Sequence, residues 1–534
     1  MRKLCGMLML LVLAVICILV LPFQTEAASE SDLTFVLIGG KEYWVKSCNK
    51  KASGDLEIPS TYQNLPVTGI EEEAFSGCKN LTGITIPDTV TQIDHYAFSG
   101  CDGLKDAHIP DVVTWNRVSF ADMYSNPLYY AQNVTMNGQK VTDLVIPGSV
   151  GKVNSRAFAG SDCFTSLTIQ EGVTEIGERA FIYCVSLKKL TLPESLTNIG
   201  EAAFLGCKGL ENVKLSNHVT QIGMEAFAWC DGLTDITLSS GLKKIEWGMF
   251  NSCTALTTVT IPNGVTEIGR SAFSGCSNLK SITIPNSVVK IADAAFNETG
   301  LIEIVIPNSV KELGSSIFGS CANLKMAKVG ANVTAVEYYM FSDCSNLEFI
   351  QLPRGLQKVN QGAFHNCEKL TQVYYEGTRE EWNQIDIYLL DEHNNNLLSA
   401  NIICLADETN ATVPTQPTEP TQPTQPSQPS RPTQPTTPSG GTSPSAPTEE
   451  TVPTPPTPPD ETVDKPTEEP GAPTVVTDPS APTEETKSET NPLVPTEPAD
   501  HKKENSANWI WLLVVVVILG GAVPVVIYLK KTKK

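Results

Sequence analysis

The sequence lacks the short motifs that mark the common enzyme classes. It contains no G-x-S-x-G, no H-E-x-x-H and no G-x-x-x-x-G-K-[ST], which excludes a nucleophile elbow, a zincin site and a phosphate-binding loop of the usual kinds. Its carboxylates also form no recognisable pair, since Glu175, Glu267 and Glu312 recur at equivalent positions that we expect to face solvent. With no constellation of catalytic side chains, the chain is not expected to be an enzyme.

Metal ligands at a useful spacing are absent as well. The chain has only six histidines, which share no ligand spacing, and none of its 15 cysteines forms a C-x-x-C motif, so no zinc site is predicted. The oxygen-rich segment DEHNNN at residues 391–396 lacks the residue order of a calcium loop, and we interpret it as a polar turn. We therefore expect no metal and no other cofactor.

Basic residues are in the minority. The chain carries 38 lysines and arginines against 59 aspartates and glutamates, a formal net charge of −21. Residues 407–500 contribute 16 acidic and 3 basic side chains, so 13 of the negative charges lie in that segment alone. Because the acidity reflects one segment and the chain has no basic excess, no nucleic-acid partner is expected.

The acidic segment is also rich in proline. Residues 414–498 hold 24 of the 37 prolines, and from 414 to 438 proline occurs at every third residue. Three residues make one turn of polyproline II, a conformation that buries no core and acts as a semi-rigid spacer. Residues 407–508 are accordingly predicted to be a disordered stalk.

The two ends of the chain indicate export and anchoring. Arg2 and Lys3 precede an apolar run at residues 8–21 and a small-residue cleavage site, so residues 1–27 are predicted to be a secretory signal peptide. Residues 509–529 carry no charge and are long enough to cross a bilayer as a helix. Four lysines among residues 530–534 place that short tail in the cytoplasm. No L-P-x-T-G motif precedes the helix, which favours a retained membrane anchor over wall attachment.

Between these ends the sequence repeats. Phenylalanine recurs at a step of 23 residues, with one step of 60 after Phe98 and one of 22 after Phe296; the series is Phe75, Phe98, Phe158, Phe181, Phe204, Phe227, Phe250, Phe273, Phe296, Phe318, Phe341 and Phe364. Each period also has apolar residues in alternation, as at Ile282 and Ile284, which indicates a half-buried strand. Stacked coils of this kind bury one continuous internal ladder, so we predict a β-rich solenoid with a parallel sheet.

The pattern L-x-x-I-x-I-P-x-x-V-x-x-I-G-x-x-A-F-x-x-C resembles the BspA-type, or treponemal-type, bacterial leucine-rich repeat. The resemblance covers residues 56–375, between an N-terminal cap at 28–55 and a C-terminal cap at 376–406, with a longer repeat inserted at about 111–147. It implies a surface-exposed binding protein, often called an adhesin, with no catalytic residues that define the family. With the anchor, this places the protein in a bacterial cell membrane as a single-pass protein with its N-terminal domain outside.

The cysteines follow the same period as the phenylalanines. Thirteen remain after the predicted signal peptide, an odd number, and the series is interrupted where Thr299 replaces cysteine. Equivalent side chains of stacked coils point in parallel, so we favour free thiols that fill the core over disulfides. Cys48 and Cys404 flank the array, and their state stays open.

Candidate binding residues are sought where the repeat departs from itself. The outward positions of the strands are expected to form two threonine-rich columns, one through Thr191, Lys214 and Thr237 and one through Lys188, Glu211 and Thr234, which we interpret as a structural sheet surface. Aromatic residues interrupt the turns instead, and our candidate ligand-binding residues are Tyr183, Trp229 and Trp247. Lateral packing of the turns is the alternative explanation for these three side chains.

Two functions stay open at this point. The first is a binding module or adhesin for an extracellular protein or glycan of host or neighbouring cells. The second is a structural coat or spacer protein without a specific ligand. The sequence identifies no ligand for the first.

Overall fold

The computed structural model describes residues 27–389 and 394–407. All of them belong to the first of two units of the chain, residues 1–430, and the second unit comprises residues 431–534. The predicted signal peptide up to residue 26, the stalk from residue 408 and the membrane helix at 509–529 lie outside the described residues. Within the described part of the chain, no helix has the length and apolar character needed to cross a membrane.

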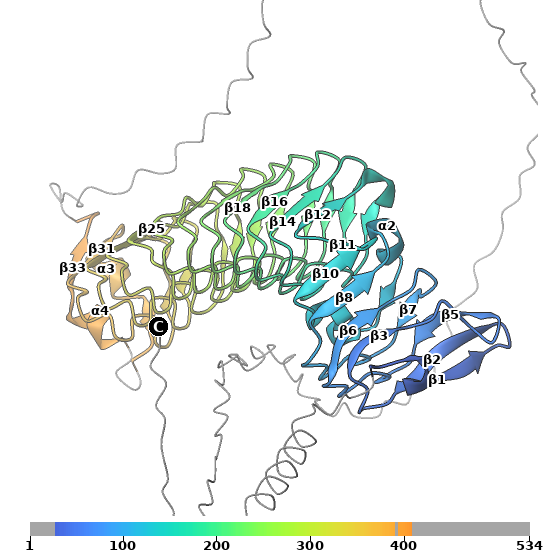
Figure 1. Cartoon of the computed structure of the whole chain (residues 1–534). Coiled ribbons are helices and arrows are strands. Elements are labelled where there is room, and N and C mark those ends of the chain that lie inside the picture. Colours follow the sequence, from blue (N-terminus) through green and yellow to red (C-terminus); the bar gives the residue numbers. More distant parts are fainter. Residues whose placement is uncertain (1–26, 390–393, 408–534) are drawn as a thin grey trace, which may run out of the picture. The chain divides into compact units, whose positions relative to one another are not determined.

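The described residues form a solenoid of stacked coils (Figure 1). Most coils contribute one strand to a main sheet and one short strand, usually of two residues, to a short sheet on another side of the coil. The coil of Ile282 and Ile284 is an exception, because the strand predicted at these residues is not formed. Strands of successive coils pair in parallel at the 23-residue step, as Leu167 with Leu190 and Ile176 with Ile199 show. The predicted leucine-rich repeat array with a parallel sheet is therefore confirmed.

The main sheet occurs in three sections. The first has the order β11-β10-β8-β6-β3, the second β12-β14-β16-β18-β20-β22, and the third β25-β27-β29-β31-β33. Their bounds are β3 (Gly54–Glu57), β6 (Leu81–Thr85), β8 (Asp106–Ile109), β10 (Asn133–Met136), β11 (Gln139–Lys140), β12 (Asp143–Ile146), β14 (Ser166–Ile169), β16 (Lys189–Thr191), β18 (Asn212–Lys214), β20 (Asp235–Thr237), β22 (Thr258–Val259), β25 (Glu303–Val305), β27 (Met326–Lys328), β29 (Phe349–Leu352), β31 (Gln372–Tyr375) and β33 (Asn401–Cys404).

The short sheet is likewise divided. Its strands are β5 (Leu65–Ile70), β7 (Gln92–Ile93), β9 (Ser119–Phe120), β13 (Lys152–Val153), β15 (Glu175–Ile176), β17 (Asn198–Ile199), β19 (Gln221–Ile222), β21 (Lys244–Ile245), β23 (Glu267–Ile268), β24 (Lys290–Ile291), β26 (Glu312–Leu313), β28 (Ala335–Val336), β30 (Lys358–Val359) and β32 (Asp386–Ile387). Most of the two-residue strands have one buried apolar residue, such as Ile176 or Ile268, which packs inside the coil.

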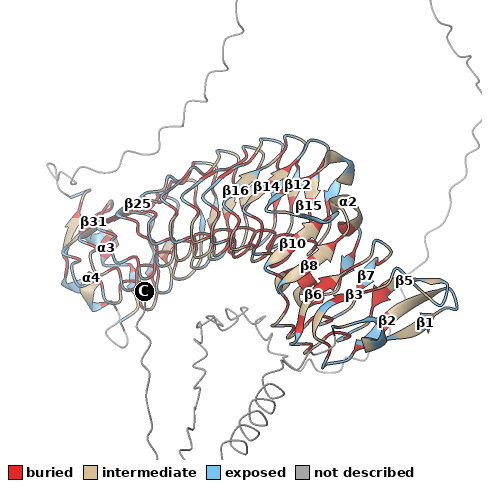
Figure 2. Cartoon of the chain, in the orientation of Figure 1, coloured by how far each residue is buried: buried red, intermediate tan, exposed pale blue. Residues whose placement is uncertain are grey.

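The phenylalanines form the centre of the core. Successive rings from Phe158 to Phe364 stack nearly parallel, with centroids 5.4–6.1 Å apart. Each ring is at most 1 % exposed, and Figure 2 shows buried residues recurring in successive coils. A single cluster of buried apolar residues, from Leu33 to Cys404, connects the coils, because no coil can bury its apolar side chains without its neighbours.

The long insertion maintains this core where the main sheet is broken. It contains α2 (Val112–Trp115) and the 3-10 turns η2 (Met123–Ser125) and η3 (Pro127–Tyr129), and η4 (Gly148–Val150) follows β12. Trp115 is fully buried, and its indole N–H donates to the carbonyl of Ala157 at 2.8 Å. The Asn126 side chain donates to the carbonyl of Arg156 at 2.8 Å. The insertion is thereby bonded to the first coil that follows it.

Two caps close the array. At the N-terminal end the 3-10 turn η1 (Glu30–Asp32) leads into an antiparallel pair of β1 (Leu33–Ile38) and β2 (Glu42–Cys48), and β2 then pairs in parallel with β5; β4 (Thr61–Tyr62) also pairs with β5. At the other end lie α3 (Arg379–Trp382) and α4 (Asn395–Ser399). There the buried Asn394 accepts from the backbone N–H of Phe364 at 3.1 Å, which covers the last rung of the phenylalanine ladder.

Both expected surface columns are exposed. The column through Thr191, Lys214 and Thr237 lies on the strands. The second column, Lys188, Glu211 and Thr234, lies directly before the strands, and backbone hydrogen bonds join its members from coil to coil. The first strand position, at Lys189, Asn212 and Asp235, is exposed as well, so the inward and outward alternation of the strand begins one residue later than expected.

Candidate binding surface

The repeated thiols lie inside the coils and have one repeated partner. The thiol of Cys276 lies 3.2 Å from the carbonyl oxygen of Phe250, the phenylalanine of the preceding coil, and donates to it. The same contact, at 3.1–3.3 Å, recurs at Cys101, Cys184, Cys207, Cys230, Cys253, Cys321, Cys344 and Cys367. The thiols therefore act as small core residues and hydrogen-bond donors.

Burial also makes these thiols poor nucleophiles. It raises the pKa of Cys207 and of Cys276 to about 12 each, so both stay protonated at neutral pH, whereas the thiolate is the reactive form. Thr299 departs from this scheme, because its hydroxyl donates at 2.9 Å to the carbonyl of Phe296 in its own coil and not to the phenylalanine of the preceding coil. In the described residues no three metal-ligating side chains come together.

The surface that varies from coil to coil is the turn edge, defined as the segment from three residues before each repeat phenylalanine to two residues after it. Two positions in this segment have a positive φ, the second before and the second after the phenylalanine. Glycine adopts that conformation without strain, and Gly160, Gly206 and Gly275 occupy the later position. Tyr183 at φ 57° and Trp229 at φ 56° occupy it in coils between those glycines.

The glycines make room for aromatic rings from the preceding segment. A Cβ at Gly206 would clash with the ring of Tyr183, and one at Gly160 would clash with the ring of Tyr129. Tyr124 contacts Tyr129 edge to face with ring centroids 5.4 Å apart, and Tyr96 stacks on Tyr124 at 6.1 Å. We call Tyr96, Tyr124, Tyr129, Tyr183 and Trp229 the aromatic strip. Tyr96 lies at the earlier positive-φ position of the coil before the insertion, Tyr124 and Tyr129 lie in the insertion, and Tyr183 and Trp229 lie at the later position of two coils after it.

A small apolar cluster supports the strip. Tyr183 and Trp229 pack on Ala159, Ile182, Ala202, Leu205 and Ala228, a group separate from the main core. In the four coils from Phe158 to Phe227, the residue directly after the phenylalanine is apolar. In the next three coils that residue is polar: Asn251, Ser274 and Asn297. The cluster is thus a local departure from the repeat. It presents Tyr183 and Trp229 half-buried, with part of each ring available at the surface.

The third candidate residue does not belong to this cluster. Trp247 stands three residues before its phenylalanine, and its carbonyl accepts from the backbone N–H of Glu225 at 2.9 Å. Trp229 instead stands two residues after its phenylalanine, Phe227. Its backbone N–H donates to the carbonyl of Asn251 at 2.7 Å. The structure brings Tyr183 and Trp229 together through one cluster, and Trp247 lies in another row of the turn edge.

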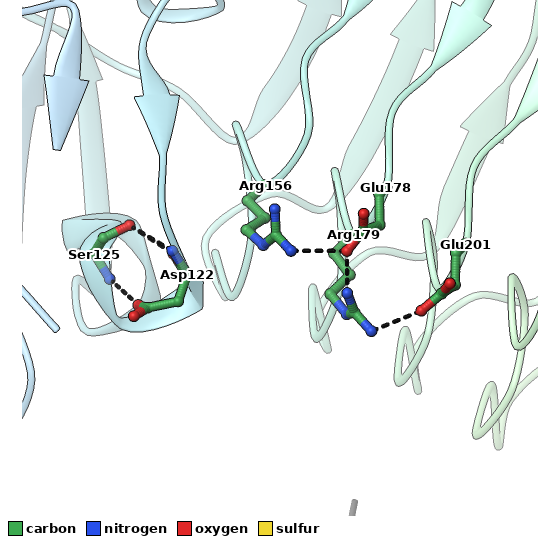
Figure 3. Close-up of polar contacts among 6 residues, drawn as sticks. All are labelled: Asp122, Ser125, Arg156, Glu178, Arg179 and Glu201. Atoms are coloured by element: carbon green, nitrogen blue, oxygen red, sulfur yellow. Dashed lines mark hydrogen bonds and ion pairs between the residues drawn. The ribbon is translucent and has the colours of Figure 1, made fainter. Parts of the chain in front are cut away.

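Charged residues line the other side of the same turns, a feature that the sequence analysis missed (Figure 3). Arg156 donates to Glu178 at 2.7 Å, Arg179 also contacts Glu178, and Arg179 donates to Glu201 at 2.7 Å. The next carboxylate, Glu225, is half-buried, and burial followed by the nearby Glu201 raises its pKa. The two arginines are 23 residues apart, as are Glu178 and Glu201, and this spacing could have predicted from the sequence that they lie in one row. Such pairs contribute little stability when exposed.

A polar pocket of about 420 Å³ lies elsewhere, at the break in the main sheet. Strands β6, β8 and β10 and the turn after β10 line it, including Asp88, His108, Asp111 and Thr135. His108 and Thr135 are 2.6 Å apart and bond to each other, and Asp111 accepts from the first residues of α2. These bonds keep the pKa of Asp111 low, with the Thr114 hydroxyl as the main cause. Three of its polar side chains are thus already engaged within the protein.

Comparison with known proteins places the chain among repeat proteins of one type. The BspA type Leucine rich repeat region matches residues 48–134, 130–257 and 244–371 in six copies. Among solved structures, a leucine rich cell surface protein from Faecalibacterium prausnitzii is 24 % identical, covers 68 % of this chain and 98 % of its own length, and gives a TM-score of 0.42. The pneumococcal vaccine antigen PcpA is 19 % identical, with 70 % and 96 % covered and a TM-score of 0.44.

A leucine-rich repeat protein from Bacteroides ovatus is 22 % identical, with 70 % of this chain and 89 % of that chain covered and a TM-score of 0.38. A search of curated proteins gave no match. These likenesses concern the fold of the described solenoid.

Proposed function

This chain belongs to the BspA-type leucine-rich repeat family, and from that premise we propose that it is a cell-surface binding module, an adhesin, which engages an extracellular macromolecule of host or neighbouring cells through its aromatic strip. The observation that carries the proposal is the apolar cluster beneath Tyr183 and Trp229. The main core continues through all coils without this cluster, so an added apolar group that holds two aromatic rings at the surface supports a role besides folding.

The residue types support this choice of site. Tyrosine and tryptophan are enriched at the energetic centres of interfaces, because they combine a large apolar area with a polar group. Two half-buried rings held in place by Gly206 and by the cluster lose little freedom on binding. The neighbouring Arg179 and Glu201 offer a donor and an acceptor at the rim. The main sheet, by contrast, presents polar and charged side chains such as Thr191 and Lys214 on β16, β18 and β20, and these three strands contain no aromatic residue.

We further propose that residues 509–529 hold the protein in the bacterial membrane and that residues 407–508 keep the solenoid away from it. The predicted signal peptide would deliver the solenoid to the outside. Membrane extraction tests the anchor: the full chain should stay with the membrane at high pH and high salt, and a chain ending at residue 508 should be released.

The binding role is tested with the full chain on an array of glycans and extracellular-matrix proteins. We expect saturable binding to at least one array member, and at least tenfold weaker binding by Tyr183→Ser and by Trp229→Ser. Tyr339→Ser is the matched control, because Tyr339 also has a positive φ and also packs over a glycine, Gly362, but lies outside the strip. Circular dichroism of each variant verifies the fold.

The alternative, a coat or spacer protein without a ligand, predicts a different result. It is supported if no array member binds saturably, or if all four chains bind equally and weakly. Trp247→Ser separates the three candidate residues: we expect it to behave like the control, because Trp247 lies in another row of the turn edge.

A further inference from the structure

Cys48 occupies, in the N-terminal cap, the place that phenylalanine takes in each coil. The backbone N–H of Cys48 donates to the carbonyl of Ala74 at 2.7 Å, and in the next coil Phe75 donates to Ala97 at 2.8 Å in the same way. The side chain of Cys48 is 6 % exposed, so it points into the coil as the phenylalanines do. The turn that leads to it is shorter than in the repeats, because Val45 pairs with Ile70 and precedes Cys48 by three residues.

The thiol ladder brings Cys78 against that same residue. In nine coils the thiol contacts the residue at the phenylalanine position of the preceding coil, as Cys101 contacts Phe75 at 3.2 Å. For Cys78 the preceding residue at that position is Cys48. The Cys48 and Cys78 thiols are therefore neighbours across one coil step, and their interaction raises the pKa of Cys48 and lowers that of Cys78. Both thiols are free and buried in the structure, and the Cys48 thiol donates to the carbonyl of Asn49 at 3.7 Å.

We propose that Cys48 and Cys78 form a disulfide that fastens the N-terminal cap to the first coil of the exported protein. Adjacent parallel strands lie ~4.8 Å apart, and disulfides join α-carbons ~4.4–6.8 Å apart, so one coil step suits the bond. The loop it closes contains the hairpin of β4 and β5 and the first turn edge. This inference does not depend on the proposed ligand, only on exposure of the chain to an oxidising compartment.

The bond forms by two thiol–disulfide exchanges with an oxidised disulfide compound, such as oxidised glutathione or an oxidised thiol oxidoreductase. The Cys78 thiolate attacks one sulfur of that disulfide and releases a thiolate. The Cys48 thiolate then attacks the Cys78 sulfur of the mixed disulfide and releases the second thiolate. Two cysteine thiols are oxidised, one disulfide of the oxidant is reduced to two thiols, and the protons pass to solvent. The contact with Cys48 lowers the pKa of Cys78, which favours Cys78 as the first attacker.

The other rungs lack this geometry. Cys253 and Cys276 occupy adjacent coils, but each thiol is directed to a phenylalanine carbonyl, of Phe227 and Phe250 respectively. For Cys78 the residue at that position of the preceding coil is instead a cysteine, Cys48. One disulfide thus stands at the end of a ladder whose other thiols stay free.

Differential alkylation of the full chain tests the assignment. The chain is refolded with a mixture of oxidised and reduced glutathione, free thiols are alkylated in denaturant, and peptides are mapped before and after reduction. We expect a peptide pair joined through Cys48 and Cys78 in most molecules, while Cys253 and Cys276 are alkylated without reduction. The pair should be absent from Cys48→Ser and from Cys78→Ser and present in Cys253→Ser.

A second measurement keeps the test valid if the serine variants fold poorly. Reductant should increase proteolysis of the cap in the oxidised wild-type chain several-fold, and should have no such effect on Cys48→Ala/Cys78→Ala. The proposal is overturned if Cys48 and Cys78 are both alkylated without reduction in the refolded chain, or if either pairs with another cysteine instead.

Discussion

Removal of one ring from the phenylalanine ladder should produce a large but local loss of stability. Phe250 is fully buried between Phe227 and Phe273, with ring centroids 6.1 and 5.4 Å away. The substitution Phe250→Ala removes the apolar surface of the ring and leaves a cavity, a change that costs ~3–5 kcal/mol in protein cores. We expect the upper half of that range, because the ring has a stacked neighbour on each side and the flanking coils restrict collapse of the cavity.

The locality follows from the architecture of a solenoid, in which each coil contacts only its neighbours. Hydrogen exchange of the native chain should therefore show lost protection in the coils of Phe227, Phe250 and Phe273 and little change near Phe98. Thr260→Ala, at an exposed position directly after β22, is the control and should change stability by less than ~0.5 kcal/mol. A cost below ~1.5 kcal/mol for Phe250→Ala, or protection lost evenly over all coils, would refute the stacked-ladder reasoning.

Three further perturbations test other parts of the structure. The raised pKa values of Cys207 and Cys276, about 12 against an ordinary 9.0, mean that unfolding releases thiol protons between these limits. The free energy of unfolding should be constant below pH ~9 and fall as the pH rises toward 12, by up to ~1.4 kcal/mol per pH unit for each thiol. In urea titrations at a series of pH values, the free energy of unfolding of Cys207→Ala should fall less steeply with pH than that of the wild type. Equal slopes would contradict the raised pKa of Cys207. Gly206→Ala should destabilise the protein by ~1 kcal/mol or more beyond Gly275→Ala. Both glycines have φ above 70°, but of the two only Gly206 has a tyrosine ring packed over it, which a Cβ would displace. Equal melting temperatures of the two variants would count against the ring contact. Thr299→Val should cost ~1 kcal/mol in urea unfolding, because it removes the hydroxyl bond to Phe296, and a neutral result would show that the thiol of Cys321 satisfies that carbonyl alone.

The sequence was sufficient to predict the repeat, the ladder and the direction of strand pairing. A fixed 23-residue period constrains every coil equally, so the position of Phe273 or Ile268 follows from that of its equivalents. The free state of the central thiols also followed, because parallel side chains in stacked coils do not face one another. The same argument does not hold at Cys48, where the cap turn is shorter and a cysteine replaces the ring.

The candidate site stays a prediction. Tyr183 and Trp229 were chosen because they interrupt the repeat, and the structure adds that both pack on one apolar cluster, to which Trp247 does not belong. The period predicts which coil a residue belongs to; its place within a turn depends on backbone angles that the sequence does not display. The arginine and glutamate series of the turn edge was missed for a different reason. Its residues recur at the 23-residue step, but arginine and glutamate are not unusual residues in the turns, so they do not mark a departure from the repeat.

One measurement most directly tests the claim that the aromatic strip binds the ligand. A ligand selected on the array is added to the full chain at saturation, and the change in hydrogen exchange is mapped along the solenoid. We predict protection in the turn edges around Tyr183, Leu205 and Trp229, with no change in the turn edge of Tyr339. Protection confined to the main sheet, to the pocket beside His108 or to the turn edge of Tyr339 would contradict it.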